Sequence, residues 1–318
     1  MLNFIQNVND YFPTNYFGEE FAKNVLAKAN YTGEQIKERN IQIKTLNGVY
    51  DTYKNAFLKA KTNIDKIQKT HHFHTQLLNI LGYDGDQHEY NDLFLINEKQ
   101  KQVIPIRHKL YRGETPHLFV MEMRAMIAEN QEDQVKGLFE QQYHARQWEH
   151  IFKVKEKEYA LSPSIINKAI SELFQLKKQQ SPQFILLLAG SQIFLIEKDR
   201  WFDGAYLQFD VEQLFVEATL PSQRNFLALF YALLGKTHLA PDADAVLMET
   251  LGEEAYKAAA GITNDLKQGV IHVVESVANE AIWYLKNKID DYNFKEEQSR
   301  FLGGVINNVI KTGFIYES

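Results

Sequence analysis

The chain has 318 residues, of which 45% are hydrophobic and 13% aromatic; this supports a buried core in one or two compact units and excludes disorder throughout. It contains no cysteine, which excludes disulfide bonds, thiolate metal sites and cysteine nucleophiles. The formal net charge of -6 excludes a protein coated in positive charge, so any contact with nucleic acid requires a local basic patch.

The first part of the chain is predicted to be helical. Apolar residues recur at helical spacing between residues 17 and 69, and Gly33 separates a short first helix from a long amphipathic second one. A shorter helix follows and ends at Gly82. Residues 83–86 then predict a turn.

Three strands are predicted next. They cover residues 92–96, 103–111 and 117–123, and a turn that contains Gly113 joins the last two. Residues 128–160 are polar and rich in Gln and Glu, which indicates a mobile insertion.

A hairpin is predicted in the second half of the chain. Residues 184–188 and 193–196 are near-continuous runs of β-forming residues around a tight turn, the pattern of buried strands. Asp210 follows and can cap a short helix. We place a domain boundary near Phe215, because the periodicity is helical from Leu220 onward. The expected units are residues 1–215 and residues 216–318.

Three passages of the sequence are similar to a known family. They are the segment from Phe184 to Phe215, the strand HLFVMEMR from His117 to Arg124, and the helical passage from Leu247 to Asn287. Together they resemble the amino-terminal region of type IIG-like fused restriction-modification proteins and the related phage-defence, adenine-specific DNA methyltransferases. The resemblance implies an α/β (α+β) fold, in which a degenerate PD-(D/E)xK restriction-endonuclease-like domain is followed by an all-α connector. It also implies that a methyltransferase follows and that S-adenosylmethionine is used there, with no cofactor in this chain.

Glu122 and Arg124 are the candidates for a relict of a nuclease site. Such nucleases hold a divalent metal between an Asp on one strand and the Glu of a Glu-x-Lys motif on the next. Glu122-Met123-Arg124 has Arg in the Lys position, and the preceding strand, residues 102–111, contains no carboxylate. Arg stays charged and cannot share a proton as Lys can. We interpret Glu122 first as an acid paired with Arg107 or Arg124, and otherwise as a metal ligand or a relict position that faces DNA.

Basic residues concentrate around these strands. Arg107, Lys109, Arg112 and Arg124 are predicted to contact duplex DNA weakly and without sequence preference, through its phosphates. An ordinary solvated face of a sheet is the alternative.

No metal site is predicted from the histidines. His71 and His74 share a helix face at i and i+3, but no third ligand lies near them in sequence, so we favour a role without metal. The sequence also lacks the Gly-rich loop and the Asn-Pro-Pro-Tyr-like loop of a methyltransferase.

The expected function is DNA contact and positioning within a restriction-modification or phage-defence DNA methyltransferase, without cleavage by this chain. One alternative is an active Mg²⁺-dependent endonuclease whose missing carboxylate comes from Asp92, Glu98 or Glu114. The other is a structural module that binds partners, such as defence-system subunits, without touching DNA. The sequence has no run of about 18 apolar residues and no signal-peptide pattern, so we expect a cytoplasmic protein without membrane contact.

Overall fold

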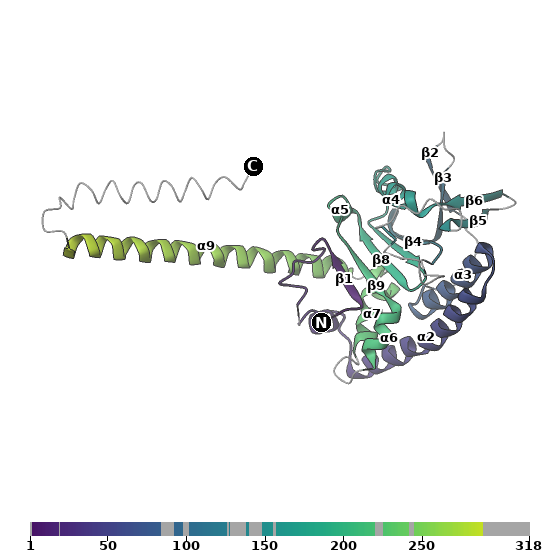
Figure 1. The fold of residues 1–318 in the computed structure, drawn as a ribbon, viewed down its shortest axis with the longest axis horizontal. Helices are drawn as coiled ribbons and strands as arrows, with labels where there is room; N and C mark the ends of the chain where they lie inside the picture. Colours follow the sequence, from purple (N-terminus) through teal and green to yellow (C-terminus); the bar gives the residue numbers. More distant parts are fainter. Residues whose placement is uncertain are drawn as a thin grey trace. The chain divides into compact units, whose positions relative to one another are not determined.

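A computed structural model of the chain describes residues 2–18, 20–83, 92–97, 102–125, 127, 138–139, 148–154, 157–219, 225–241 and 245–288. The chain divides into two compact units, Met1–Tyr256 and Lys257–Ser318. The first unit is a mixed α/β domain (Figure 1). The described part of the second unit belongs to a single long helix.

The helices of the first unit pack on both faces of its sheet. They are α1 (Phe21–Lys28), α2 (Gly33–Lys59), α3 (Asn63–Ile80), α4 (Ile166–Phe174), α5 (Lys198–Trp201), α6 (Val211–Ala218), α7 (Phe226–Leu234) and α8 (Lys236–Leu239). Helix α9 (Leu247–Lys288) begins in this unit and continues into the second. Among the described residues, no helix is long and apolar enough to cross a membrane.

The described strands form one large sheet and one separate hairpin. The large sheet contains β1 (Ile5–Val8), β2 (Asp92–Asn97), β3 (Gln102–Arg112), β4 (Thr115–Glu122), β7 (Phe184–Ala189), β8 (Gln192–Glu197) and β9 (Tyr206–Asp210), in the order β1-β9-β8-β7-β4-β3-β2. Strands β4 and β7 are parallel, and the other neighbours are antiparallel. The strands of the predicted meander and of the predicted hairpin therefore lie in one sheet.

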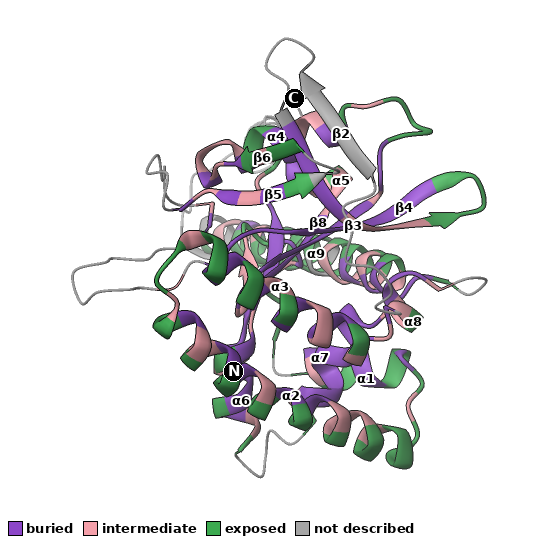
Figure 2. Cartoon of the chain, turned by 90° about the vertical axis from the view of Figure 1, so that its right-hand side faces the viewer, coloured by how far each residue is buried: buried purple, intermediate pink, exposed green. Residues whose placement is uncertain are grey.

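The central strands are buried on both faces. Leu118 and Val120 of β4 belong to a core shared with α2, α3 and α7, whereas Phe119 and Met121 belong to a second core that includes α4. This alternation follows from the two-residue period of a strand. Figure 2 shows the same division, with buried strands inside and exposed outer faces on α2 and α3. The near-continuous apolar sequence of β7 is explained by this double burial.

The predicted long helix is wrong at its carboxyl end. It is interrupted between Lys59 and Asn63, where the Thr62 hydroxyl accepts a hydrogen bond from the Asp65 backbone N–H and caps α3. Helices α2 and α3 then pack on each other, with the rings of Tyr53 and Phe73 stacked 4.6 Å apart. Apolar periodicity continues across the break because both helices face the same core.

Two further elements were not expected from the sequence. Strand β1 pairs with β9 at the edge of the sheet. The hairpin of β5 (His150–Val154) and β6 (Lys157–Leu161) lies within the predicted insertion, whose residues 128–137 and 140–147 are outside the described residues.

The first unit continues past Phe215, where sequence analysis placed the boundary. Every residue of α7 after Phe226 is buried. The ring centroids of Phe230 and of Phe209 in β9 are 6.1 Å apart. Because α7 completes the core on one face of the sheet, the compact unit extends to Tyr256.

Candidate functional site

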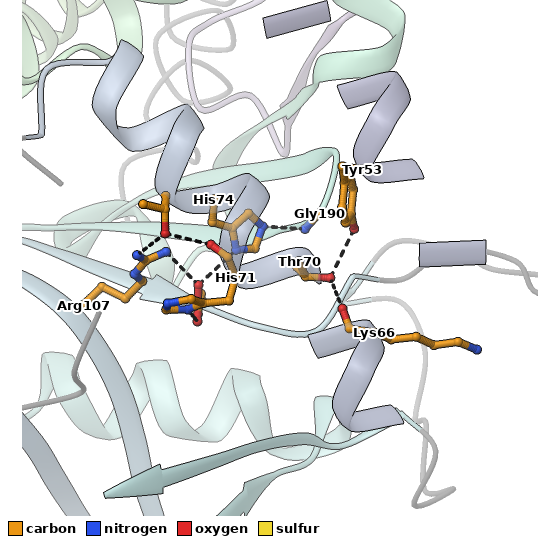
Figure 3. A network of polar contacts seen from close by, with 9 residues as sticks. Tyr53, Lys66, Thr70, His71, His74, Arg107 and Gly190 are labelled. Carbon is orange, nitrogen blue, oxygen red and sulfur yellow. Dashed lines mark hydrogen bonds and ion pairs between the residues drawn. The ribbon is translucent and has the colours of Figure 1, made fainter. Parts of the chain in front are cut away.

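Glu122 lies at the end of β4, opposite Leu188 of β7, and is 1% exposed. One carboxylate oxygen, Oε1, is 2.7 Å from Nδ1 of His71. The other, Oε2, is 3.1 Å from Nδ1 of His74 and accepts a hydrogen bond of 3.0 Å from Nη1 of Arg107. Helix α3 and strand β3 thus supply three partners to one buried carboxylate (Figure 3).

The contacts of His74 fix its tautomer. The backbone N–H of Gly190, in the β7–β8 turn, donates to Nε2 of His74 at 2.9 Å. Nε2 therefore carries no proton, so Nδ1 is protonated and donates to Glu122. His74 is a neutral bridge between the sheet turn and the carboxylate.

The partners of Glu122 keep it ionised. Burial by itself raises the pKa of Glu122, but the hydrogen bonds from His71 and His74 and the charge of Arg107 together hold that pKa well below its usual range. For His74 the balance is reversed, because burial lowers the pKa more than Glu122 raises it. Burial likewise lowers the pKa of the nearby His150 to about 4.

Arg107 completes the network from β3. Its side chain is 4% exposed, and Nη2 donates to the Thr75 hydroxyl at 2.9 Å while Nη1 engages Glu122. Thr75 in turn donates to the backbone oxygen of His71. The guanidinium of Arg107 therefore binds α3 and Glu122, and the ion pair between Arg107 and Glu122 is one of the pairings that the sequence predicted.

Arg124 is held in a different place. Its Nε donates to Asn63 at 2.6 Å and its Nη1 to the Ala125 backbone oxygen at 2.8 Å. The guanidinium also lies over the rings of Phe57 and Trp148, at 5.3 and 4.7 Å. Arg124 is 1% exposed, and its side chain is enclosed by residues of α2 and α3 and by Trp148, which precedes β5.

The four residues predicted to contact DNA do not form one surface patch. Arg107 and Arg124 are buried, so neither guanidinium reaches a phosphate in this conformation. Lys109 is half-buried, with its ammonium 5.6 Å from the Phe119 ring centre. Arg112 is exposed and pairs with Glu249 at 3.2 Å. Of these four residues, Lys109 and Arg112 are therefore the two that can contact a phosphate.

Two of the three carboxylates proposed for an active nuclease have a described backbone position. Asp92 pairs with Ile106 at the far edge of the sheet, and Glu114 is exposed in the β3–β4 turn. Glu98 lies outside the described residues. The part of the chain that the structure describes contains no group of three or more His, Cys, Asp or Glu residues that could hold a metal ion.

His71 connects the buried network to the surface. Its side chain is 24% exposed and lines a cavity of about 340 Å³ between α3 and the β5–β6 hairpin. The apolar residues that line this cavity are Ile64, Ile67, Ile151 and Phe152. The sequence predicts a shared helix face for His71 and His74, whereas the contact of both residues with Glu122 was not predicted. The sequence signal that could have indicated this contact is a pair of histidines three residues apart together with an acid at the end of a buried strand.

Comparison with known proteins gives no relative: no family model, no curated protein and no solved structure matches the chain.

Proposed function

We propose that this chain is a non-cleaving, nuclease-like region of a fused restriction-modification or phage-defence adenine-specific DNA methyltransferase. Its work is to position DNA and the rest of that protein, and S-adenosylmethionine would be used by a separate methyltransferase domain. We infer that the chain does not cleave DNA because His71, His74 and Arg107 enclose the carboxylate of Glu122.

The enclosure is incompatible with the metal chemistry of a nuclease. A divalent ion needs carboxylate oxygens that face an open position for water and substrate. Both oxygens of Glu122 instead accept hydrogen bonds from protein side chains, and the adjacent Arg107 supplies the positive charge that a metal would supply. A metal ion at Glu122 would have to displace these partners and leave Arg107 buried without its counter-ion, which is costly.

The arrangement of the elements is in keeping with the nuclease-like resemblance. Helix α3 precedes the meander β2-β3-β4, and α4 precedes β7, which lies parallel to β4. The Glu-x-Arg sequence falls at the end of β4, the strand that the resemblance assigns to the Glu-x-Lys motif. The proposal is that the fold was retained while the catalytic acid acquired a structural role.

The test is incubation of the purified chain with supercoiled plasmid and Mg²⁺ or Mn²⁺. The plasmid should stay intact, and the Glu122→Ala variant, checked for folding by circular dichroism, should behave in the same way. Metal-dependent cleavage that Glu122→Ala abolishes and Glu114→Ala preserves would overturn the proposal and establish Glu122 as a catalytic residue.

A further inference from the structure

A second cavity lies at the ends of β4 and β7 opposite to Glu122. Its volume is about 590 Å³, and its wall comes from the β3–β4 turn, the start of β4, the segment between α4 and β7, α5 and the start of α9. Arg112, Lys178 and Lys198 all line it. Three cations from separate parts of the chain thus meet at one cavity, in a protein whose net charge is -6.

The ammonium group of Lys198 is held in place by a neutral partner. Its Nζ donates to the Ser181 hydroxyl at 2.8 Å, and this hydroxyl donates to the backbone oxygen of Phe174 at 3.1 Å. Ser181 is 4% exposed, so the interior of the domain sets its orientation. An ammonium group has three N–H donors, of which the hydroxyl accepts one. This contact therefore fixes the position of the cation without neutralising its charge.

Hydrogen bonds of the sheet continue up to the wall of this cavity. The backbone N–H of Gln183 donates to the His117 oxygen at 3.0 Å, and the backbone N–H of Lys198 donates to the Gln183 oxygen at 2.9 Å. The side-chain amide of Gln183 also donates to Asp199 at 3.2 Å. A wall that is already ordered loses little entropy when a ligand binds, which favours binding.

The acids at this cavity do not balance its cations. The two carboxylates that line it are Asp199 and Glu249, against three cations. Glu249 pairs with Arg112 at 3.2 Å, but the two side chains are 42% and 44% exposed, and an ion pair so exposed contributes little. Within the described part of the chain, neither Lys178 nor Lys198 forms a salt bridge. The cavity therefore carries an excess of positive charge.

We propose that this cavity binds a phosphate group. Lys178 and Lys198 donate hydrogen bonds from their ammonium groups, and the planar guanidinium of Arg112 turns from Glu249 to bind two phosphate oxygens. A phosphate suits cations that come from several directions because it has several acceptor oxygens. The volume also admits the group to which the phosphate is attached.

The phosphate can belong to a nucleic-acid backbone or to a small phosphorylated molecule. Both sources present the same oxygens to the three cations, so the experiment has to distinguish them. The inference rests on the cavity alone and does not depend on the proposed function, which is tested separately by plasmid cleavage.

The test is a titration of the isotope-labelled chain with inorganic phosphate in chloride buffer, followed by NMR. The backbone amide signals of Ser181, Gln183 and Lys198 should shift in a saturable way. Lys178→Gln, which changes an exposed side chain, should weaken binding about tenfold, because a hydrogen bond to a charged group is lost. Lys44→Gln, at an exposed position on α2, is the matched control and should bind as the wild type does.

Two variants of Lys198 separate its charge from its contact with Ser181. Lys198→Gln should weaken phosphate binding at least as much as Lys178→Gln, whereas Lys198→Arg keeps the charge and should retain most of the affinity. The amide spectrum of each variant also reports whether it is folded. The absence of a saturable shift, or equal affinity in Lys178→Gln, Lys198→Gln and the wild type, would overturn the proposal.

Competition with a short DNA duplex identifies the source of the phosphate. Displacement of inorganic phosphate by the duplex in the wild type, together with weaker duplex binding in Lys178→Gln, supports a backbone phosphate at this cavity. Saturable binding of inorganic phosphate that the duplex does not displace supports a small phosphorylated molecule as the ligand.

Discussion

Glu122 is a buried acid at the end of β4. Its neighbours determine the outcome, because three hydrogen-bonding side chains compensate the burial of its charge. His74 takes part as a neutral ring whose tautomer is set by the Gly190 backbone. The acid at the strand end was visible in the sequence, whereas its partners from α3 became apparent only in the fold.

The buried histidines predict a loss of stability on acidification. The folded-state pKa of His150 is about 4, below that of an unfolded histidine, so between these values the unfolded chain binds a proton that the folded chain does not. Stability should therefore fall as the pH drops from about 6.5 toward 4, and His74 contributes in the same direction. Glu122, whose folded pKa is depressed, loses its contribution only at lower pH, as pH falls through that depressed value.

Urea unfolding at pH 7 and pH 5 measures this loss. The wild-type unfolding free energy is expected to be lower at pH 5 than at pH 7. In the His150→Phe variant, whose new ring can stack near Phe152, this difference should be smaller by about 1–2 kcal/mol. The exposed His72→Gln variant is the control and should keep the wild-type decrease. An unchanged decrease in His150→Phe would show that His150 is not a source of the pH dependence.

At the scale of elements, the β7–β8 hairpin holds the network together from the sheet side. Gly190 has φ +70°, donates its N–H to His74, and lies so close to Ala125 that an added Cβ would clash with it. A glycine is required here for both conformation and space.

Gly190→Ala should destabilise the domain by about 2–4 kcal/mol, because a left-handed alanine and the clash with Ala125 both oppose folding. Gly113→Ala is a matched control, since Gly113 also has a positive φ of +63° but nothing within 4 Å of the added Cβ. That control should lose only about 1 kcal/mol. Chemical denaturation compares the two variants, and equal losses would mean that Ala125 moves aside without cost.

At the scale of the whole molecule, the four cations predicted to contact DNA do not gather on one exposed face. Two of the predicted contacts are buried in the core, and Arg112 is paired with Glu249. With a net charge of -6, any DNA affinity of this chain rests on few contacts.

Binding of labelled duplex DNA, followed by anisotropy against salt concentration, tests this count. If Lys109 and Arg112 each neutralise one phosphate, the log-log slope should be about -1.8, whereas four contacts would give about -3.6. Lys109→Glu/Arg112→Glu should abolish binding to every sequence alike, and Lys44→Glu, at an exposed site on α2, should have little effect. A slope near -3.6 would show that cations besides Lys109 and Arg112 contact phosphates. No binding at about 50 mM salt would favour a scaffold without DNA contact.

By itself, the sequence determined the local elements, because periodicity and turn residues act over short distances. The elements that lie where their patterns predict are the β7–β8 hairpin, the Asp210 cap, the three meander strands and the long α9. Short or weakly patterned elements such as β1 and β5–β6 were missed, because four or five residues carry little periodic signal. Only the tertiary structure decided the role of Glu122, Arg107 and Arg124. Burial and partner choice depend on residues far apart in sequence, such as Arg124 and Asn63, which are 61 positions apart and which only folding brings together.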